Sequence, residues 1–230
     1  MKKFAACLLV LLPTLASTAF AANAPWVEGV HYFRLDQARL EQAQVGAQPA
    51  GKSTVTEVFS YGCPACNAFL PYWRSFKATL PAGTVVDYIP AAFIPAEDWP
   101  MFQRAYLAAK ALGIAERTHE AMFDAVWKTG ELGTMDPATR GLKRAMPGIE
   151  DAAKFYERVA GVPAGRFLAV ARSFTIELDM KKADERILAL QADSTPTLIV
   201  NGRYRVSQES AGGFQQLIDL AKWLVAKDGH

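Results

Sequence analysis

Cys63 and Cys66, separated by two residues, are the side chains whose types and spacing point most clearly to chemistry. Such a pair can be a structural cross-link, half of a zinc site or a dithiol that exchanges with other disulfides. A cross-link over so short a loop stabilises by roughly 2 kcal/mol, against nearly 5 for a loop of about 100 residues. Zinc needs two more ligands, and the chain has no second cysteine pair and only three histidines, without ligand-like spacing: His31, His119 and His230. We therefore expect a redox-active dithiol with no metal and no other cofactor.

The segments on either side of this pair are of the kind that activates a thiol. Residues 55–61 are mostly β-branched or aromatic and predict a strand, and residues 64–77 predict a helix with a proline, Pro71, inside it. Cys63 would then lie at a helix N-terminus, where free N–H groups and the helix dipole stabilise a thiolate. A lowered pKa makes Cys63 a good leaving group and favours the reduced dithiol, so the disulfide form oxidises other thiols. Cys66, one turn further on, would be the resolving thiol.

The rest of the chain predicts an α/β fold interrupted by helices. Residues 84–93 predict a second strand, and residues 197–206 predict a hairpin that turns at Asn201-Gly202. Residues 213–227 predict a closing helix with one apolar face.

Between about residues 97 and 179 the apolar residues recur with a helical period, for example at Phe167, Val170 and Phe174. We interpret these stripes as packed core rather than as a ligand pocket. The predicted organisation is one domain made of residues 22–96 and 181–230, with an inserted helical domain of residues 97–180.

Residues 1–21 have the pattern of a secretory signal peptide. Lys2 and Lys3 precede an apolar run, which ends in a stretch of mostly small residues, 16–21, where Ala19 and Ala21 have the A-x-A spacing of a signal peptidase site. The alternative is a retained anchor, but the run is shorter than the roughly 20 apolar residues of a membrane-spanning helix. Cleavage after Ala21 would remove Cys7 and leave one cysteine pair, in a compartment where disulfides persist.

Charge makes two partner classes unfavourable. Without the signal peptide, 23 of the 25 basic residues remain against 23 acidic ones. Such a balance offers no electrostatic footprint for nucleic acid or for an anionic membrane surface.

Two stretches of the sequence resemble the DsbA family of thioredoxin-like thiol–disulfide oxidoreductases. They are Glu57-Val58-Phe59-Ser60-Tyr61-Gly62-Cys63-Pro64-Ala65-Cys66 and Ser194-Thr195-Pro196-Thr197, and the helical insertion is also similar. The resemblance implies a thioredoxin-like fold, with a cis bond at Thr195-Pro196 beside the cysteines and substrate backbone pairing there. It also implies that Glu57 is a buried acid that assists proton movement at the resolving cysteine. The alternative is a carboxylate that points outward from the strand.

The family further implies a periplasmic enzyme that donates disulfides to reduced, unfolded exported proteins. A membrane quinone reductase of the DsbB type would reoxidise it. About thirty residues precede the first predicted strand after cleavage, too few for the dimerisation domain common in exported isomerases, so we expect a monomer. A reductase or isomerase, and a peptide-binding chaperone with a vestigial cysteine pair, remain alternatives.

Ala65 departs from the best-known members of this family, which have histidine between the cysteines. Because alanine has no side-chain group that stabilises a thiolate, the Cys63 thiolate would be stabilised mainly by the helix terminus. We expect oxidase activity that is weaker than that of a histidine-bearing variant.

Overall fold

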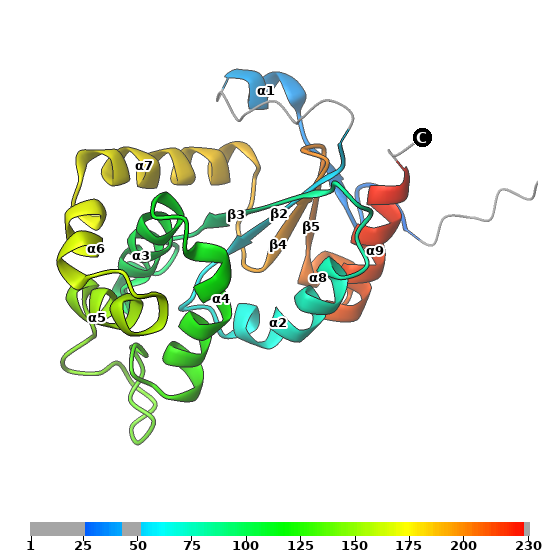
Figure 1. Cartoon of the computed structure of the whole chain (residues 1–230). Coiled ribbons are helices and arrows are strands. Elements are labelled where there is room, and N and C mark those ends of the chain that lie inside the picture. The colour runs from blue at the N-terminus through cyan, green and yellow to red at the C-terminus, as the bar shows by residue number, and fades with distance from the viewer. Residues whose placement is uncertain (1–25, 43–51, 228–230) are drawn as a thin grey trace, which may run out of the picture.

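The computed structural model describes residues 26–42 and 52–227 (Figure 1). The predicted signal peptide, Cys7 and His230 lie outside these residues. None of the helices formed by the described residues is both long and apolar enough to cross a membrane.

The described strands form one sheet in the order β1-β5-β4-β2-β3. The strands are β1 (Phe33–Arg34), β2 (Thr54–Phe59), β3 (Val85–Pro90), β4 (Thr197–Val200) and β5 (Tyr204–Ser207). β2 pairs parallel with β3, whereas β4 is antiparallel to both β2 and β5. All six residues of β2 are buried because the strand is central and both faces of the sheet are covered.

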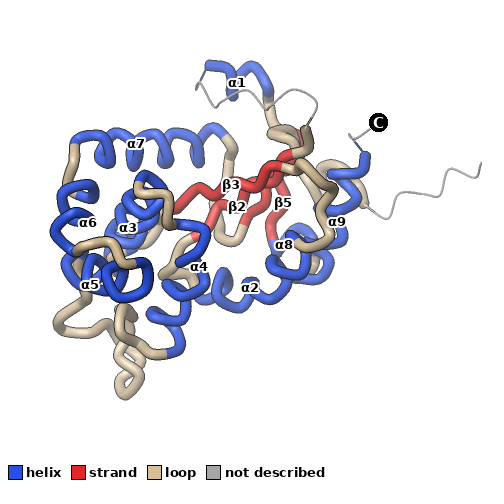
Figure 2. The backbone as a smooth tube through the Cα atoms, viewed as in Figure 1, coloured by secondary structure: helices blue, strands red, loops and turns tan. Residues whose placement is uncertain are grey.

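Helices cover both faces of this sheet (Figure 2). α2 (Pro64–Lys77) and α9 (Phe214–Lys227) pack on one face, where Val55 of β2 joins their apolar cluster. α1 (Gln37–Gln42) and part of α7 (Phe174–Ala189) pack on the other, around Val58. The short α8 (Gln208–Ala211) leads from β5 into α9. The predicted βαβ start, the hairpin and the closing helix are therefore confirmed.

The segment between β3 and β4 is helical, as predicted. A short 3₁₀ turn (Pro95–Glu97) is followed by α3 (Trp99–Ala111), α4 (Ala115–Phe123), a π-helical turn (Asp124–Lys128), α5 (Ile149–Ala160), α6 (Ala164–Ala171) and α7. We call α3 to α7 the helical block; it lies beside one end of the sheet in Figure 1. Its buried aromatic residues form a cluster that also includes Phe59, Tyr61 and both cysteines.

One predicted stripe of the helical block is wrong at its end. Phe167 is fully buried, but Phe174 is 76% exposed. The pattern assumed one helix, whereas α6 ends at Ala171 and Ser173 caps a new helix, α7. The phase of the helical period restarts at that cap, so residue 174 points to solvent.

The structure differs from the predicted elements in two further ways. β1 was not predicted, because two residues carry no periodic signal and become a strand only by pairing with β5. α7 runs through residue 180, the predicted end of the inserted domain. The domain boundaries at residues 96 and 180 stay a prediction.

Candidate active site at the start of α2

Cys63 is the N-cap residue of α2, as its position in the sequence predicts. Its backbone is extended, with φ −85° and ψ 118°, and its Sγ accepts a hydrogen bond from the backbone N–H of Cys66 at 3.4 Å. As a thiol, the same Sγ donates to the backbone oxygen of Thr195 at 3.3 Å. Both cysteines are free thiols in this structure, with Cys63 5% exposed and Cys66 1% exposed.

The two thiols have opposite acidities. A hydrogen bond from the Cys66 side chain is the largest of the effects that lower the pKa of Cys63 to about 6. The Thr195 side chain and the backbone N–H groups of Cys66 and Ala65 act in the same direction, and burial opposes them. Burial, followed by the neighbouring Cys63, raises the pKa of Cys66 well above its ordinary value. At neutral pH the pair therefore presents one thiolate and one protonated thiol.

The two residues between the cysteines play different parts. Pro64 is exposed at the first position of α2, where its missing N–H costs the helix no hydrogen bond. Ala65 is half-buried and offers Cys63 a backbone N–H but no side-chain donor.

Glu57 is buried, so the outward-pointing alternative is wrong. The residue is 3% exposed, and its Oε2 has no hydrogen-bond partner within the described part of the chain. Burial raises the pKa of Glu57 to about 8; Lys77 counteracts this shift and Cys63 adds to it. Glu57 pairs in register with Tyr88 of β3, whose hydroxyl bonds to Lys77 Nζ at 3.1 Å and to Trp73 Nε1 at 2.9 Å. Because side chains alternate along a strand, Glu57 lies on the same face of β2 as Val55, the face that α2 covers.

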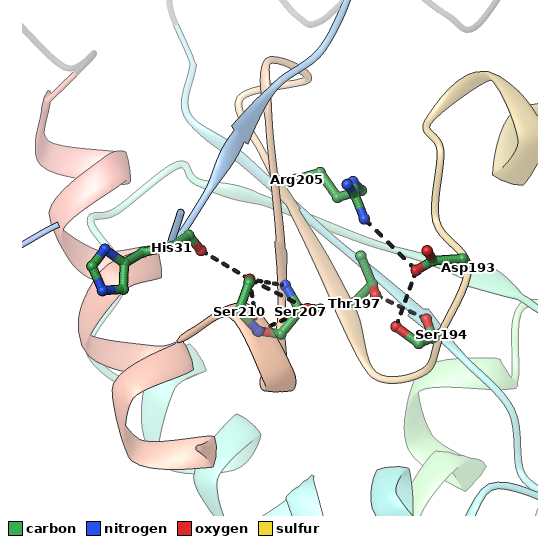
Figure 3. A network of polar contacts seen from close by, with 7 residues as sticks. All are labelled: His31, Asp193, Ser194, Thr197, Arg205, Ser207 and Ser210. Carbon is green, nitrogen blue, oxygen red and sulfur yellow. Dashed lines mark hydrogen bonds and ion pairs between the residues drawn. The ribbon is translucent and has the colours of Figure 1, made fainter. Parts of the chain in front are cut away.

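Thr195-Pro196 lies against Cys63 with a cis peptide bond, as the resemblance implies. The loop that carries it is held by the polar contacts drawn in Figure 3. The Asp193 carboxylate forms an ion pair with Arg205 at 3.7 Å and accepts a hydrogen bond from Ser194 Oγ at 3.4 Å. Thr197 Oγ1 donates to the backbone oxygen of Ser194 at 2.8 Å, which links the loop to β4.

The residues that hold the turn before Cys63 were not predicted from the sequence. The backbone oxygen of Tyr61 accepts a hydrogen bond from Trp127 Nε1 at 2.8 Å. The hydroxyl of Tyr61 lies 3.1 Å from Nδ1 of His119, a residue weighed from the sequence only as a zinc ligand. Trp99 packs on Gly62. No sequence spacing could have shown these contacts, because all three partners belong to the helical block.

This arrangement can carry out thiol–disulfide exchange. Cys63 is the acidic and more accessible sulfur, and Cys66 lies one helical turn behind it with a buried carboxyl group nearby. No group of three or more His, Cys, Asp or Glu side chains among residues 26–42 and 52–227 could hold a metal ion.

Comparisons with known proteins agree with this geometry. The family model described as Thioredoxin matches residues 40–220 of the chain. The chain is 34% identical to the thiol:disulfide interchange protein DsbA of Pseudomonas aeruginosa over 79% of its own length and 78% of the relative's. It is 32% identical to DsbA of Azotobacter vinelandii over 79% and 77% of the two chains.

Solved structures give the same result for the whole fold. A crystal structure of DsbA from Pseudomonas aeruginosa matches with a TM-score of 0.68 and 31% identity, covering 88% of this chain and 94% of that one. The oxidoreductase DsbA from Xylella fastidiosa matches with a TM-score of 0.69 and 30% identity, covering 86% and 95%. These relatives have a thioredoxin-like fold with an inserted helical domain.

Proposed function

Because this chain belongs to the DsbA family of thiol:disulfide interchange proteins, we propose that Cys63 and Cys66 are the pair with which it introduces disulfide bonds into exported proteins. The chain is a thiol:disulfide oxidoreductase. One observation carries the assignment of the site: Cys63 caps α2 with its pKa lowered to about 6, while Cys66 behind it is protonated. The redox-active disulfide itself serves as the oxidant, with no further cofactor.

The reaction begins with the oxidised pair. A substrate thiolate attacks Cys63 Sγ, the Cys63–Cys66 bond breaks, and a mixed disulfide forms between Cys63 and the substrate. The Cys66 sulfur leaves with the electron pair and takes up a proton. Glu57 supports this step, because its pKa of about 8 keeps a proton available near neutral pH.

A second substrate thiolate then attacks the substrate sulfur of the mixed disulfide. The substrate gains a disulfide, and Cys63 leaves as a thiolate. A low pKa of the leaving thiol speeds this step. The stable Cys63 thiolate also favours the reduced enzyme, and therefore favours oxidation of the substrate. The enzyme ends as a dithiol that holds the two electrons removed from the substrate.

The partners and location follow from the same proposal. Substrates are reduced, unfolded exported proteins whose backbone pairs beside Thr195-Pro196, and Pro64 and Ala65 border the site. Reoxidation is by a membrane quinone reductase of the DsbB type. The working protein is a periplasmic monomer, without residues 1–21.

Two assays on the purified mature protein test the function. Oxidised protein should restore activity to a reduced, unfolded model enzyme, and Cys63→Ser should abolish this. Mixed with a model protein that carries a disulfide, Cys66→Ser should instead accumulate a mixed disulfide: Cys63 attacks that disulfide, one substrate thiolate leaves, and no resolving thiol remains in the enzyme. Insulin reduction without oxidative refolding, together with a mostly reduced pair trapped in cells, would establish a reductase or isomerase instead. Binding of unfolded protein that survives Cys63→Ser, with neither redox activity, would establish a chaperone.

The pH dependence of alkylation tests the site. Because its folded pKa is about 6, Cys63 should react with iodoacetamide at a rate that rises to half its plateau near pH 6. Cys66 should stay unreactive at this pH because its pKa is raised. A midpoint above pH 8 would contradict the proposed thiolate.

A further inference from the structure

The turn that leads into Cys63 is held by the helical block rather than by the sheet that carries it. Tyr61 is contacted twice: Trp127 Nε1 donates to its backbone oxygen at 2.8 Å, and His119 Nδ1 lies 3.1 Å from its hydroxyl. His119 belongs to α4, and Trp127 to the π-helical turn that follows it. One continuous helical segment therefore forms hydrogen bonds with both the backbone and the side chain of Tyr61.

The turn of residues 60–62 is also tightly packed against α3 and is held by hydrogen bonds within the turn. A Cβ on Gly62 would lie 2.6 Å from Trp99 Nε1, so α3 closes the turn on that side. Within the turn, the N–H of Gly62 donates to Ser60 Oγ at 3.2 Å and that of Cys63 to the Ser60 backbone oxygen at 3.1 Å. A displacement of Tyr61 would therefore pass directly to Cys63.

His119 is a polar side chain in an apolar environment, and packing alone does not explain its presence there. The residue is 4% exposed, and its ring is surrounded by aromatic rings at centroid distances from 4.7 to 6.3 Å, those of Phe59, Tyr61, Tyr88, Tyr106 and Phe123. Its Nε2 has no hydrogen-bond partner among the described residues. An apolar side chain would fill this space without burying an unpaired polar atom, which costs free energy. The contact that only the histidine can make is the one to the Tyr61 hydroxyl.

We propose that His119 is a positioning residue for Cys63: its hydrogen bond to Tyr61 fixes the turn of residues 60–62 so that Cys63 Sγ faces the N–H groups at the start of α2. The inference rests on the proposed role of Cys63 as the exchanging thiol. Stabilisation by a helix terminus falls off within the first turn, so the acidity of Cys63 depends on where this turn holds it.

The charge of His119 cannot be the way in which this residue affects the acidity of Cys63. Burial lowers the pKa of His119 to about 3, so the imidazole is neutral throughout the working range. Its replacement by another neutral side chain changes no charge near the cysteines. A changed acidity of Cys63 in such a variant must then come from geometry.

The test is the pKa of Cys63 in variants that remove the contact from either side. Tyr61→Phe removes only the hydroxyl, and His119→Leu removes the imidazole; each should raise the alkylation midpoint of Cys63 by about one pH unit, a tenfold change in the thiol–thiolate equilibrium. Because the Tyr61 hydroxyl also interacts with Tyr156, the double variant should shift the midpoint no further than Tyr61→Phe alone, in which the contact with His119 is already lost. His119→Gln, whose amide oxygen can accept from Tyr61, should restore part of the acidity.

A control separates positioning from general loss of stability. Ile187→Ala creates a cavity in the buried cluster between α7 and the sheet, which contains no residue of the turn. It should lower the melting temperature without moving the midpoint of Cys63. If His119→Leu does not fold, Tyr61→Phe alone decides the matter.

Unchanged Cys63 midpoints in Tyr61→Phe and in any folded His119→Leu protein would overturn the proposal, as would an equal shift in Ile187→Ala. The unsubstituted protein distinguishes this failure from failure of the proposed function. A midpoint near pH 6 in that protein, with no change in the variants, would reject only the role of His119.

Discussion

Two loops border Cys63, and they are built in opposite ways. The turn of residues 60–62, the inner turn, is completely buried and is held by aromatic side chains of the helical block. The loop of residues 193–196, the outer loop, begins with two exposed residues, and the Asp193 side chain is 82% exposed. Figure 3 shows its polar contacts, which join the exposed Asp193 and Ser194 to Arg205 and to the buried Thr197.

The difference matches what each loop contributes. The inner turn aligns the sulfur with the start of α2, and this requires a rigid, fully packed environment. The outer loop would meet the substrate backbone, so it must stay accessible. Exposed ion pairs contribute little to stability, and most of the energy that fixes this active site should therefore lie on the inner side.

The largest effect that sharpens this comparison should come from Glu57, on the strand that leads into the inner turn. Its folded pKa of about 8 lies above its unfolded value of 4.5, so the folded protein binds this proton more tightly than the unfolded chain does. The resulting contribution to stability is fully present below about pH 4.5 and is lost as the pH rises from there through 8. Glu57→Gln should therefore raise the free energy of unfolding at pH 8 by on the order of 3 kcal/mol and change little at pH 4.

Urea unfolding at the two pH values measures this effect, with the exposed Glu41→Gln as a control that should change neither value. Equal stabilisation of Glu57→Gln at pH 4 and pH 8 would show that ionisation of the buried acid is not the cause. Glu57→Gln should also slow the release of Cys66 from the enzyme disulfide, because a proton donor is lost.

Gly62→Ala should give the next largest effect, because it overpacks the inner turn. The new Cβ would meet Trp99 Nε1 at 2.6 Å, and we expect a loss of about 2 kcal/mol in the free energy of unfolding. Gly165→Ala is the matched control, since nothing lies within 4 Å of its Cβ and alanine favours a helix. Denaturant unfolding that gives the same result for both variants would mean that the inner turn is not tightly packed.

Ala65→His should have a smaller effect, because residue 65 is only half-buried. An imidazole beside Cys63 would stabilise the thiolate, lower its pKa by up to about one unit and raise the reduction potential by up to about 30 mV. Equilibration with glutathione measures the potential. An unchanged potential would show that the residue between the cysteines does not tune this site.

Asp193→Asn should change stability least. Since the ion pair with Arg205 spans 3.7 Å and the carboxylate is largely exposed, we expect less than about 0.5 kcal/mol in the free energy of unfolding. Thermal and urea unfolding of this variant at low and high salt are the measurement. A loss above about 1.5 kcal/mol would remove the distinction between the two loops.

The sequence alone was sufficient for the features that depend on local pattern. The strand before Cys63, the helix after it and the hairpin at Asn201-Gly202 each follow from residues that are neighbours in the chain. Local pattern failed where the phase of a pattern restarted, as at Phe174, or where a strand was too short to show one, as at β1.

Tertiary structure decided the features that depend on distant partners. Whether Glu57 pointed inward could not follow from strand alternation, because both faces of β2 are buried. The contact between Tyr61 and His119 joins residues 58 positions apart, and that between Cys63 and Thr195 joins residues 132 positions apart. The residue types on a short segment determine which thiol can become acidic, but burial and hydrogen-bond geometry determine how acidic it is. Only the folded chain supplies those.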